Sequence, residues 1–257
     1  MLPRISADTA LFLDFDGTLV ELASQPEAVE IPPGLVDSLK TLSHQLNGAL
    51  ALVSGRRMLD LDQFLSPLRL PTAAEHGAHR RSADGELTSA HAVNMEAVLQ
   101  TAGALVSQHP GLRLEQKNLA ISLHYRHAPE LESLCLAEMQ AGIARSTGLD
   151  LMQGKCVIDI KPAGVSKGTA IAAFMAEAPF AGRTPLFAGD DVTDEAGFTQ
   201  VQSMGGYAVK VGQGPTVAQH RCDSVGQLMA WLQSAVMANQ ATDTHNSNAK
   251  GSERLSA

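Results

Sequence analysis

The stretch Ala10-Leu-Phe-Leu-Asp-Phe-Asp-Gly-Thr-Leu19 is an apolar run that ends abruptly in two aspartates, Asp14 and Asp16, followed by a glycine. A short apolar run that stops at glycine predicts a buried parallel strand entering a turn. In an open α/β sheet, ligands bind just beyond the carboxyl ends of such strands. Two carboxylates placed there repel each other and need a cation or a proton to coexist. The stretch therefore indicates a metal-assisted phosphoryl-transfer site at the edge of a parallel sheet.

The composition is that of an ordinary globular protein of 257 residues, of which 44% are hydrophobic and 18% are charged. This length allows one large domain or two modest ones around a substantial core. The formal net charge of −8 argues against binding to nucleic acid or to an anionic membrane, because both require a basic surface. An anionic substrate therefore has to be held by a few placed cations or by a metal.

The cysteines and the two ends of the chain carry little chemistry. Three widely spaced cysteines, Cys135, Cys156 and Cys222, favour free thiols in a reducing compartment over a disulfide framework or a zinc site. Residues 1–8 carry one arginine, and no apolar run of about 18 residues occurs, so we expect no signal peptide, no membrane span and a cytoplasmic protein. Residues 239–257 are poor in apolar side chains, and we expect them to form a disordered tail.

Strand-like and helix-like segments alternate in the first third of the chain, which is typical of a parallel α/β sheet. Apolar runs predict strands over 10–13 and 49–53, and apolar residues at helical spacing predict helices over 35–46 and 58–65. The same alternation returns after residue 163. It predicts helices over 167–177, from 193 onward and over 228–237, with strands over 185–188 and 207–211.

The middle of the chain has a different pattern, with hairpins in place of crossovers. The first hairpin has Asp84-Gly85 at its turn. The block then predicts a helix over 95–106, paired strands over 112–116 and 119–125, a helix over 129–147 and a strand over 156–160. We therefore expect the fold class α/β: a Rossmann-like parallel-sheet core formed by residues 1–79 and 163–238, interrupted by an inserted α+β domain over residues 80–162.

Four separated segments bring charged or hydroxyl side chains to predicted strand ends or helix starts of this core. They are Asp14-x-Asp16, Ser54-Gly55-Arg56, Lys167, and the acidic run Asp190-Asp191-Val192-Thr193-Asp194-Glu195. A small hydroxyl and free main-chain N–H groups at a helix start can bind an oxyanion. A lysine at a helix start opposes the helix macrodipole, so the position is favourable mainly when an anion lies nearby.

The five aspartates and one glutamate of these segments would repel each other strongly if they met at one sheet edge, and a divalent cation removes that repulsion. Oxygen ligands shared with a phosphate are typical of Mg²⁺, whereas the segments lack the histidines and cysteines that zinc prefers. Each segment alone has an ordinary alternative, as a turn, a loop, a solvated lysine or a helix N-cap. All four in this order, each at an element junction, favour one shared phosphate and metal site.

The four segments resemble the motifs of the haloacid dehalogenase (HAD) superfamily, and from about Ala10 to Leu232 the chain is similar to bacterial trehalose-6-phosphate phosphatases. The similarity includes further motifs, which are Glu75-His76-Gly77, Glu115-x-Lys117, His124-Tyr125-Arg126, Gly154-Lys155 and Asp159-Ile-Lys-Pro162. The resemblance implies that the parallel-sheet core is a HAD core and that the inserted α+β domain is a cap that closes over the site.

The resemblance also implies roles for the core residues. Asp14 is the expected nucleophile, and Asp16 is expected to protonate the leaving oxygen and then to deprotonate water. Mg²⁺ would be held by Asp14, by the main-chain carbonyl of Asp16 and by Asp190, with Asp191 in an outer position or bound through water. The phosphoryl oxygens would be bound by a further set, namely Ser54, Gly55, Lys167 and Thr18, and Asp194 would support Lys167 or the waters of the metal.

In the cap, the resemblance implies that Glu115, Lys117 and Asp159 contact sugar hydroxyls, although Asp159 stands where the family pattern leads us to expect glutamate. Further expected substrate contacts are His124, Arg126 and Lys155 from the inserted domain and Arg56 and His76 from the core. The residues alone leave alternatives open, because Glu115, Lys117 and His124 could form a solvated strand face. Arg56 and Arg126 could equally form salt bridges between cap and core.

The implied function is Mg²⁺-dependent hydrolysis of trehalose 6-phosphate through an aspartyl-phosphate, the last step of trehalose biosynthesis. The expected partner is a small sugar phosphate, with no obligate protein partner. A phosphatase for another sugar phosphate, such as sucrose 6-phosphate, and a sugar phosphomutase are alternatives on the same core. An inactive sugar-phosphate sensor is a third alternative, which the presence of Asp14, Asp16, Lys167 and Asp190 disfavours.

Overall fold

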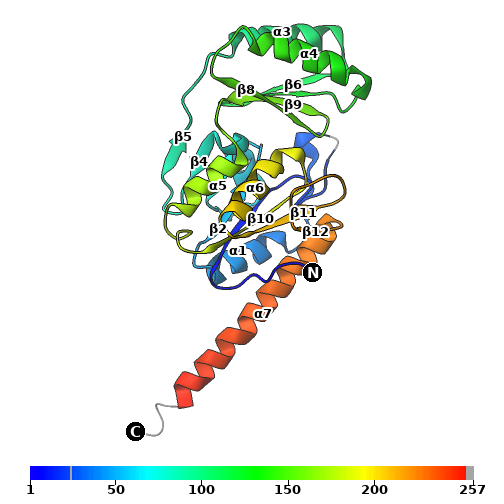
Figure 1. Ribbon diagram of the computed structural model, residues 1–257. Coiled ribbons are helices and arrows are strands. Elements are labelled where there is room, and N and C mark those ends of the chain that lie inside the picture. The colour runs from blue at the N-terminus through cyan, green and yellow to red at the C-terminus, as the bar shows by residue number, and fades with distance from the viewer. Residues whose placement is uncertain (24, 253–257) are drawn as a thin grey trace.

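The computed structural model of the protein describes residues 1–23 and 25–252, with side chains as far as residue 238. Figure 1 shows a larger lobe built around one sheet, a smaller lobe above it, and the last helix pointing away from the larger lobe. Each lobe has its own cluster of buried apolar side chains. The two lobes are the expected core and the expected inserted cap.

The core sheet has eight strands in the order β12-β11-β10-β1-β2-β3-β4-β5. Neighbouring strands from β12 to β3 are parallel, and β4 and β5 complete the sheet as an antiparallel hairpin. The strands are β1 (Thr9–Leu13), β2 (Leu50–Val53), β3 (Thr72–Ala74), β4 (His79–Arg81), β5 (Leu87–Ser89), β10 (Thr184–Gly189), β11 (Tyr207–Val211) and β12 (His220–Cys222). The parallel α/β fold predicted from the sequence is confirmed.

Strand β1 lies in the middle of the sheet between β10 and β2, and all five of its residues are buried. Such a strand has helices on both faces and is therefore mostly apolar, here at every position after Thr9. In Figure 1, α1 and α7 lie on one side of the sheet and α5 and α6 on the other. The helices of this lobe are α1 (Leu35–Gln45), α2 (Met58–Phe64), α5 (Lys167–Met175), α6 (Glu195–Ser203) and α7 (Val225–Ser252), with the short 3-10 helices η1 (Pro26–Ala28), η2 (Glu75–Gly77) and η4 (Val192–Asp194).

The cap is a four-stranded antiparallel sheet in the order β6-β7-β9-β8, with two helices on the side away from the core (Figure 1). Its elements are β6 (Arg113–Gln116), β7 (Ile121–His124), β8 (Leu149–Gly154), β9 (Val157–Pro162), α3 (Glu96–Gln108), α4 (Glu132–Ile143) and the 3-10 helix η3 (Pro129–Leu131). The register pairs Glu115 with Ser122, and Ser122 with Asp159. Directly opposed residues share one face of a sheet, so these three side chains lie together.

Three details differ from the prediction. The hairpin β4–β5 pairs with β3, so by sheet membership it extends the core, and the inserted block starts after Ser89 and not at residue 80. The short strands β3 and β12 and the longer β8 were not predicted, because their sequences are brief or poor in β-branched residues. Helix α7 continues to Ser252, where we expected a disordered tail from residue 239; residues 253–257 lie outside the described residues.

Across the described residues, none of the helices combines the length and the apolar composition that crossing a lipid bilayer requires. The cytoplasmic location stays a prediction.

Substitution of Phe12 by alanine should lower the free energy of unfolding by about 3–5 kcal/mol, because it leaves a cavity in the core. Phe12 is fully buried in β1, and its ring lies 5.4 Å from that of Phe180 and 6.0 Å from that of Phe174. Urea denaturation of the wild type and of the Phe12→Ala variant measures the loss of unfolding free energy. Leu59→Ala is the control, because Leu59 is 63% exposed. Equal losses in the two variants would contradict this account of the core.

Candidate active site

A buried lysine joins two aspartates at the carboxyl end of the core sheet. Helix α5 begins at Lys167 because Ser166 caps it, with its hydroxyl accepting the N–H of Thr169 at 3.0 Å. The Lys167 Nζ donates to Asp14 Oδ1 at 2.7 Å and to Asp194 Oδ1 at 2.6 Å. Burial lowers the pKa of Lys167, but the two carboxylates outweigh burial and raise it above its ordinary value. Lys167 is therefore a fixed positive charge.

Carboxylates outnumber cations around this lysine. Single oxygen atoms of Asp14, Asp190 and Asp194 lie within 4.8 Å of one another. Burial, with the charge of the neighbouring carboxylates, raises the pKa of Asp14 and raises that of Asp190 to about 7. The repulsion that raises these values is relieved when a cation binds, and an all-oxygen donor set suits a hard divalent ion. The residues present thus fit the expected metal.

Gly17 leaves the space that the Asp190 carboxylate occupies. A Cβ atom at residue 17 would lie 2.2 Å from Asp190 Oδ2, and the residue has a φ of 73°. Both observations require glycine at this turn. On the other side of Asp190, the buried Lys210 in β11 donates from its Nζ to the Asp190 main-chain carbonyl. Asp190 is therefore held by its backbone as well as by its position after β10.

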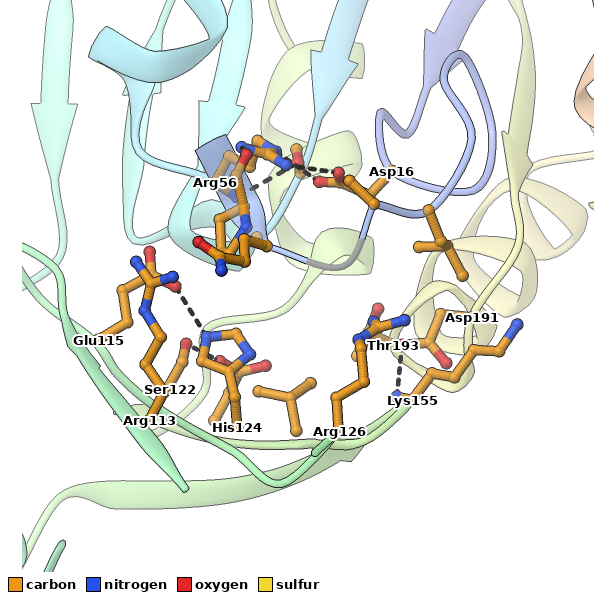
Figure 2. A pocket seen from close by; sticks show the side chains of 18 of the residues that line it. Asp16, Arg56, Arg113, Glu115, Ser122, His124, Arg126, Lys155, Asp191 and Thr193 are labelled. Carbon is orange, nitrogen blue, oxygen red and sulfur yellow. Dashed lines mark hydrogen bonds and ion pairs between the residues drawn. The ribbon is translucent and has the colours of Figure 1, made fainter. Parts of the chain in front are cut away.

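Asp16 and Arg56 form a two-pronged ion pair within the core. Arg56 Nε donates to Asp16 Oδ2 at 2.6 Å, and its Nη2 donates to Oδ1 at 2.7 Å (Figure 2). The guanidinium also lies 5.0 Å from the ring centre of Phe64 and 5.6 Å from that of Phe15. We expected Arg56 to contact substrate or to bridge cap and core. The structure pairs it with Asp16 of the same domain and not across the two domains, and its contact with substrate stays a prediction.

We expected Asp191 in an outer position of the metal site, and its carboxylate accepts two main-chain N–H groups. Its Oδ1 accepts the N–H of Val192 at 2.8 Å, and its Oδ2 accepts the N–H of Lys155 in the cap at 3.1 Å (Figure 2). Asp191 thus caps η4 and joins core to cap. Asp194 lies in the acidic cluster beside Lys167, as the expectation of support for that lysine requires.

The loop after β2 presents small groups to the same space. The Ser54 hydroxyl is buried and accepts the N–H of Arg56 at 3.2 Å. At Gly55, an added Cβ would lie 2.5 Å from the His76 ring, so a larger residue would not fit against that histidine. The Gly55 carbonyl accepts the Nζ of Lys117 at 2.8 Å, which brings a cap lysine onto a core loop.

The polar face of the cap sheet forms two groups. In one, His124 Nε2 and Glu115 Oε2 are 2.9 Å apart. Burial raises the pKa of Glu115, but the hydrogen bond from His124 and the charge of Lys117 outweigh burial and leave the pKa below its usual value. In the other group, Asp159 contacts the Ser122 hydroxyl and lies 3.3 Å from His76 Nε2 and 3.7 Å from Lys117 Nζ.

The Asp159 group is a buried charge network. Burial raises the pKa of Asp159, but Lys117 and His76 outweigh burial and hold it well below its usual range. Burial lowers the pKa of His76, and the neighbouring Asp159 only partly opposes this shift. Asp159 is therefore ionised, His76 is neutral at pH 7, and the charge of Lys117 is the main compensation.

Between the two lobes lies a cavity of about 380 Å³. It is lined by the predicted site residues except Thr18 and Asp194, which lie behind its wall. The Thr18 hydroxyl donates to Asp14 Oδ2 at 3.2 Å. In Figure 2, Arg126 and Lys155 reach from the cap on the side of Asp191, and Glu115 and His124 lie on the other side. The motifs thus surround one cavity, although the first and the last of these residues, Asp14 and Asp191, lie 177 positions apart in the sequence.

Three contributions were not predicted: those of Lys210 and Ser122, and the contact of Glu75 with the cap. Lys210 had a usable signal, because a charged residue inside the apolar strand Tyr-Ala-Val-Lys-Val must be paired or exposed. Ser122 and Glu75 had none, because their partners lie on other elements.

Replacement of His76 by asparagine should flatten the dependence of stability on pH. The unfolded chain binds a proton at His76 as the pH falls through about 6.5, whereas the lowered pKa of folded His76 delays this to a lower pH, so acid destabilises the wild type. Asparagine tolerates the left-handed backbone of residue 76, whose φ is 61°. Denaturation between about pH 7.5 and 5.5 measures the slope, with exposed His91→Asn as control. If the free energy of unfolding changed equally with pH in His76→Asn and in wild type, the assignment of a lowered pKa to folded His76 would be refuted.

Comparison with known proteins agrees with this geometry. The sequence profile of the family described as "Trehalose-phosphatase" matches residues 12–225. The chain is 44% identical to trehalose-6-phosphate phosphatase of Escherichia coli over 249 residues, which cover 95% of this chain and 92% of that protein. 

Two solved structures show the same fold. The C-terminal domain of Candida albicans trehalose-6-phosphate phosphatase superposes with a TM-score of 0.81 and 24% identity, covering 90% of this chain and 92% of that one. A HAD-superfamily phosphatase from Bacteroides thetaiotaomicron superposes with a TM-score of 0.61 and 16% identity, covering 93% and 98%. The profile match and the 44% identity show that the chain belongs to the trehalose-phosphatase family, and the two solved structures show that it has the fold of a HAD-superfamily phosphatase.

Proposed function

We propose that this phosphatase hydrolyses trehalose 6-phosphate to trehalose and phosphate, with Mg²⁺, through an aspartyl-phosphate on Asp14. The observation that carries the proposal is the pairing of Asp14 with Lys167 at the core side of a cavity whose cap side is polar. The 44% identity to the Escherichia coli enzyme supports trehalose 6-phosphate as the substrate.

In the first step, an Asp14 carboxylate oxygen attacks phosphorus and the bond to the sugar oxygen breaks. Lys167 and Thr18 each donate to an Asp14 oxygen, so the carboxylate is oriented before substrate arrives. Asp16 gives its proton to the leaving sugar oxygen. In the second step water attacks phosphorus, Asp16 takes a proton from that water, and the bond between phosphorus and the Asp14 oxygen breaks, which releases phosphate and the free carboxylate. For either transfer, the Asp16 carboxyl group has to leave Arg56 and turn toward Asp14.

The metal would be held by the carboxylates of Asp14 and Asp190 and by the main-chain carbonyl of Asp16, with Asp191 acting through water. When bound, Mg²⁺ supplies positive charge that offsets the repulsion between carboxylate and phosphate. The buried cluster of Asp14, Asp190 and Asp194 supports this assignment, because its charge exceeds that of Lys167. The all-oxygen donor set supports Mg²⁺ over softer metals.

The remaining cavity groups would bind the phosphate and the sugar. On the core side, Lys167, the Ser54 hydroxyl and the Gly55 N–H are available for phosphoryl oxygens. On the cap side, the charged and polar groups suit the many hydroxyls of a neutral disaccharide, and these groups are Glu115, Lys117, His124, Arg126, Lys155 and Asp159. Asp159 is already held by three partners, so a sugar hydroxyl would join an existing network at that position.

A phosphate-release panel tests the substrate and the metal together. We expect release from trehalose 6-phosphate to exceed that from sucrose 6-phosphate and glucose 6-phosphate by at least about tenfold, the value of one well-placed polar contact. Chelation of divalent ions should abolish release, and added Mg²⁺ should restore it. Faster release from another sugar phosphate would reassign the substrate, and full activity after chelation would refute the metal.

Asp14→Asn should lower turnover by about 10³-fold or more with the fold intact, because the amide is not a nucleophile. Phosphate release and circular dichroism measure the two properties. Asp37→Asn on the exposed face of α1 serves as the matched control and should leave turnover unchanged. Substantial residual hydrolysis by the Asp14 variant would exclude the nucleophile assignment.

A further inference from the structure

The segment Glu75-His76-Gly77 of η2 has a costly backbone. Its three residues have φ values of 50°, 61° and 104°, all in the left-handed region, and only the third is glycine. A non-glycine residue in this region is strained and persists only where its surroundings hold it there. Glu75 is also fully buried, which is unusual for a glutamate. Backbone strain and a buried charge coincide at one residue.

Two main-chain hydrogen bonds attach this segment to the loop after β2. The Glu75 N–H donates to the Arg56 carbonyl at 2.9 Å, and the His76 N–H donates to the Ser54 carbonyl at 2.9 Å. The strained segment therefore runs alongside the Ser54-Gly55-Arg56 loop and is hydrogen-bonded to it. Movement of either one displaces the other.

The Glu75 side chain reaches the other domain. Its Oε2 accepts the main-chain N–H of Leu119 at 2.7 Å, and its Oε1 accepts that of Asn118 at 3.2 Å. Both N–H groups belong to the turn between β6 and β7 of the cap. Hydrogen bonds from neutral donors to a carboxylate are stronger than those between neutral groups, and burial strengthens them further.

Lys117 precedes this turn and makes a second contact between the domains. Its Nζ donates to the Gly55 carbonyl at 2.8 Å and lies 3.7 Å from Asp159. Two contacts thus hold the turn against the core. Glu75 binds the main chain of the turn, and the Gly55 carbonyl binds the side chain of Lys117. When the turn is displaced, Lys117 loses its place in the cavity.

We infer that Glu75 is a positioning residue, which docks the β6–β7 turn of the cap on the core and thereby sets Lys117 between the Ser54-Gly55-Arg56 loop and Asp159. The inference rests on the proposed function, because a disaccharide phosphate needs the cap-side groups whereas a small phosphate ester needs only the core. Glu75 does not touch the reacting atoms, so its effect is on the choice of substrate and not on the chemical step.

Two substitutions test the docking contact in different ways. Glu75→Gln places an amide N–H group against one of two N–H donors, so one hydrogen bond becomes a repulsion. Glu75→Asp keeps the charge, suits the left-handed backbone and falls one methylene short of the turn. Because Glu75→Asp buries no donor against another, it tests the contact even where the glutamine variant does not fold. Glu130→Gln, exposed on the cap, is the control.

The kinetic readout compares trehalose 6-phosphate with p-nitrophenyl phosphate. We expect the kcat/KM for trehalose 6-phosphate to fall by about tenfold or more in both Glu75 variants, mainly through KM, with that for p-nitrophenyl phosphate within about twofold of wild type. Equal losses on the two esters would mean that Glu75 acts only through general stability and would overturn the inference.

Amide hydrogen exchange of the full chain without substrate gives an independent readout. We expect Asn118 and Leu119 to exchange at least about tenfold faster in Glu75→Asp, with the amides of β1 unchanged. Unchanged exchange at these two amides would overturn the inference. The two proposals can fail separately. If exchange is faster only in the turn and the wild type does not hydrolyse trehalose 6-phosphate, the docking contact is supported and only the proposed substrate is refuted.

Discussion

The contact of Lys167 with Asp14 and Asp194 is the interaction on which the site depends. The carboxylates of Asp14, Asp190 and Asp194 lie together beyond the carboxyl ends of β1 and β10. The buried Lys167 side chain donates to two of them. Removing one partner of such a buried set leaves an uncompensated charge in a region of low dielectric. The Ser166 cap, which begins α5 at residue 167, therefore matters as much for the site as for the helix.

The contacts between cap and core form a second layer around that centre. Lys117 reaches Gly55, Asp159 reaches His76, and the main chain at Lys155 binds Asp191. Each joins a cap element to a residue that follows a core strand, so the polar groups of both domains are fixed relative to Asp14. These contacts are polar rather than apolar, as is common at interfaces between domains of one chain.

Much of the fold follows from local patterns in the sequence. The apolar runs at β1, β2, β10 and β11 and the helical spacing at α1, α3 and α5 identify these elements within one or two residues at most ends. The elements and sheet pairings that were not predicted are those that depend on partners elsewhere in the chain. Strand β3 is three residues of threonine and alanine, and the hairpin β4–β5 joins the core sheet only because β3 offers it an edge.

By itself, the sequence determined the chemistry: carboxylates, a hydroxyl and a lysine at strand ends and helix starts, in an order that fits one family. Only the tertiary structure decided which charges meet. Arg56 was an expected substrate contact and is paired with Asp16, Asp191 caps η4, and Glu75 reaches the cap from the core. The physical reason is that these pairings join residues up to 44 positions apart, as from Glu75 to Leu119, and depend on side-chain reach and burial, which no local pattern encodes.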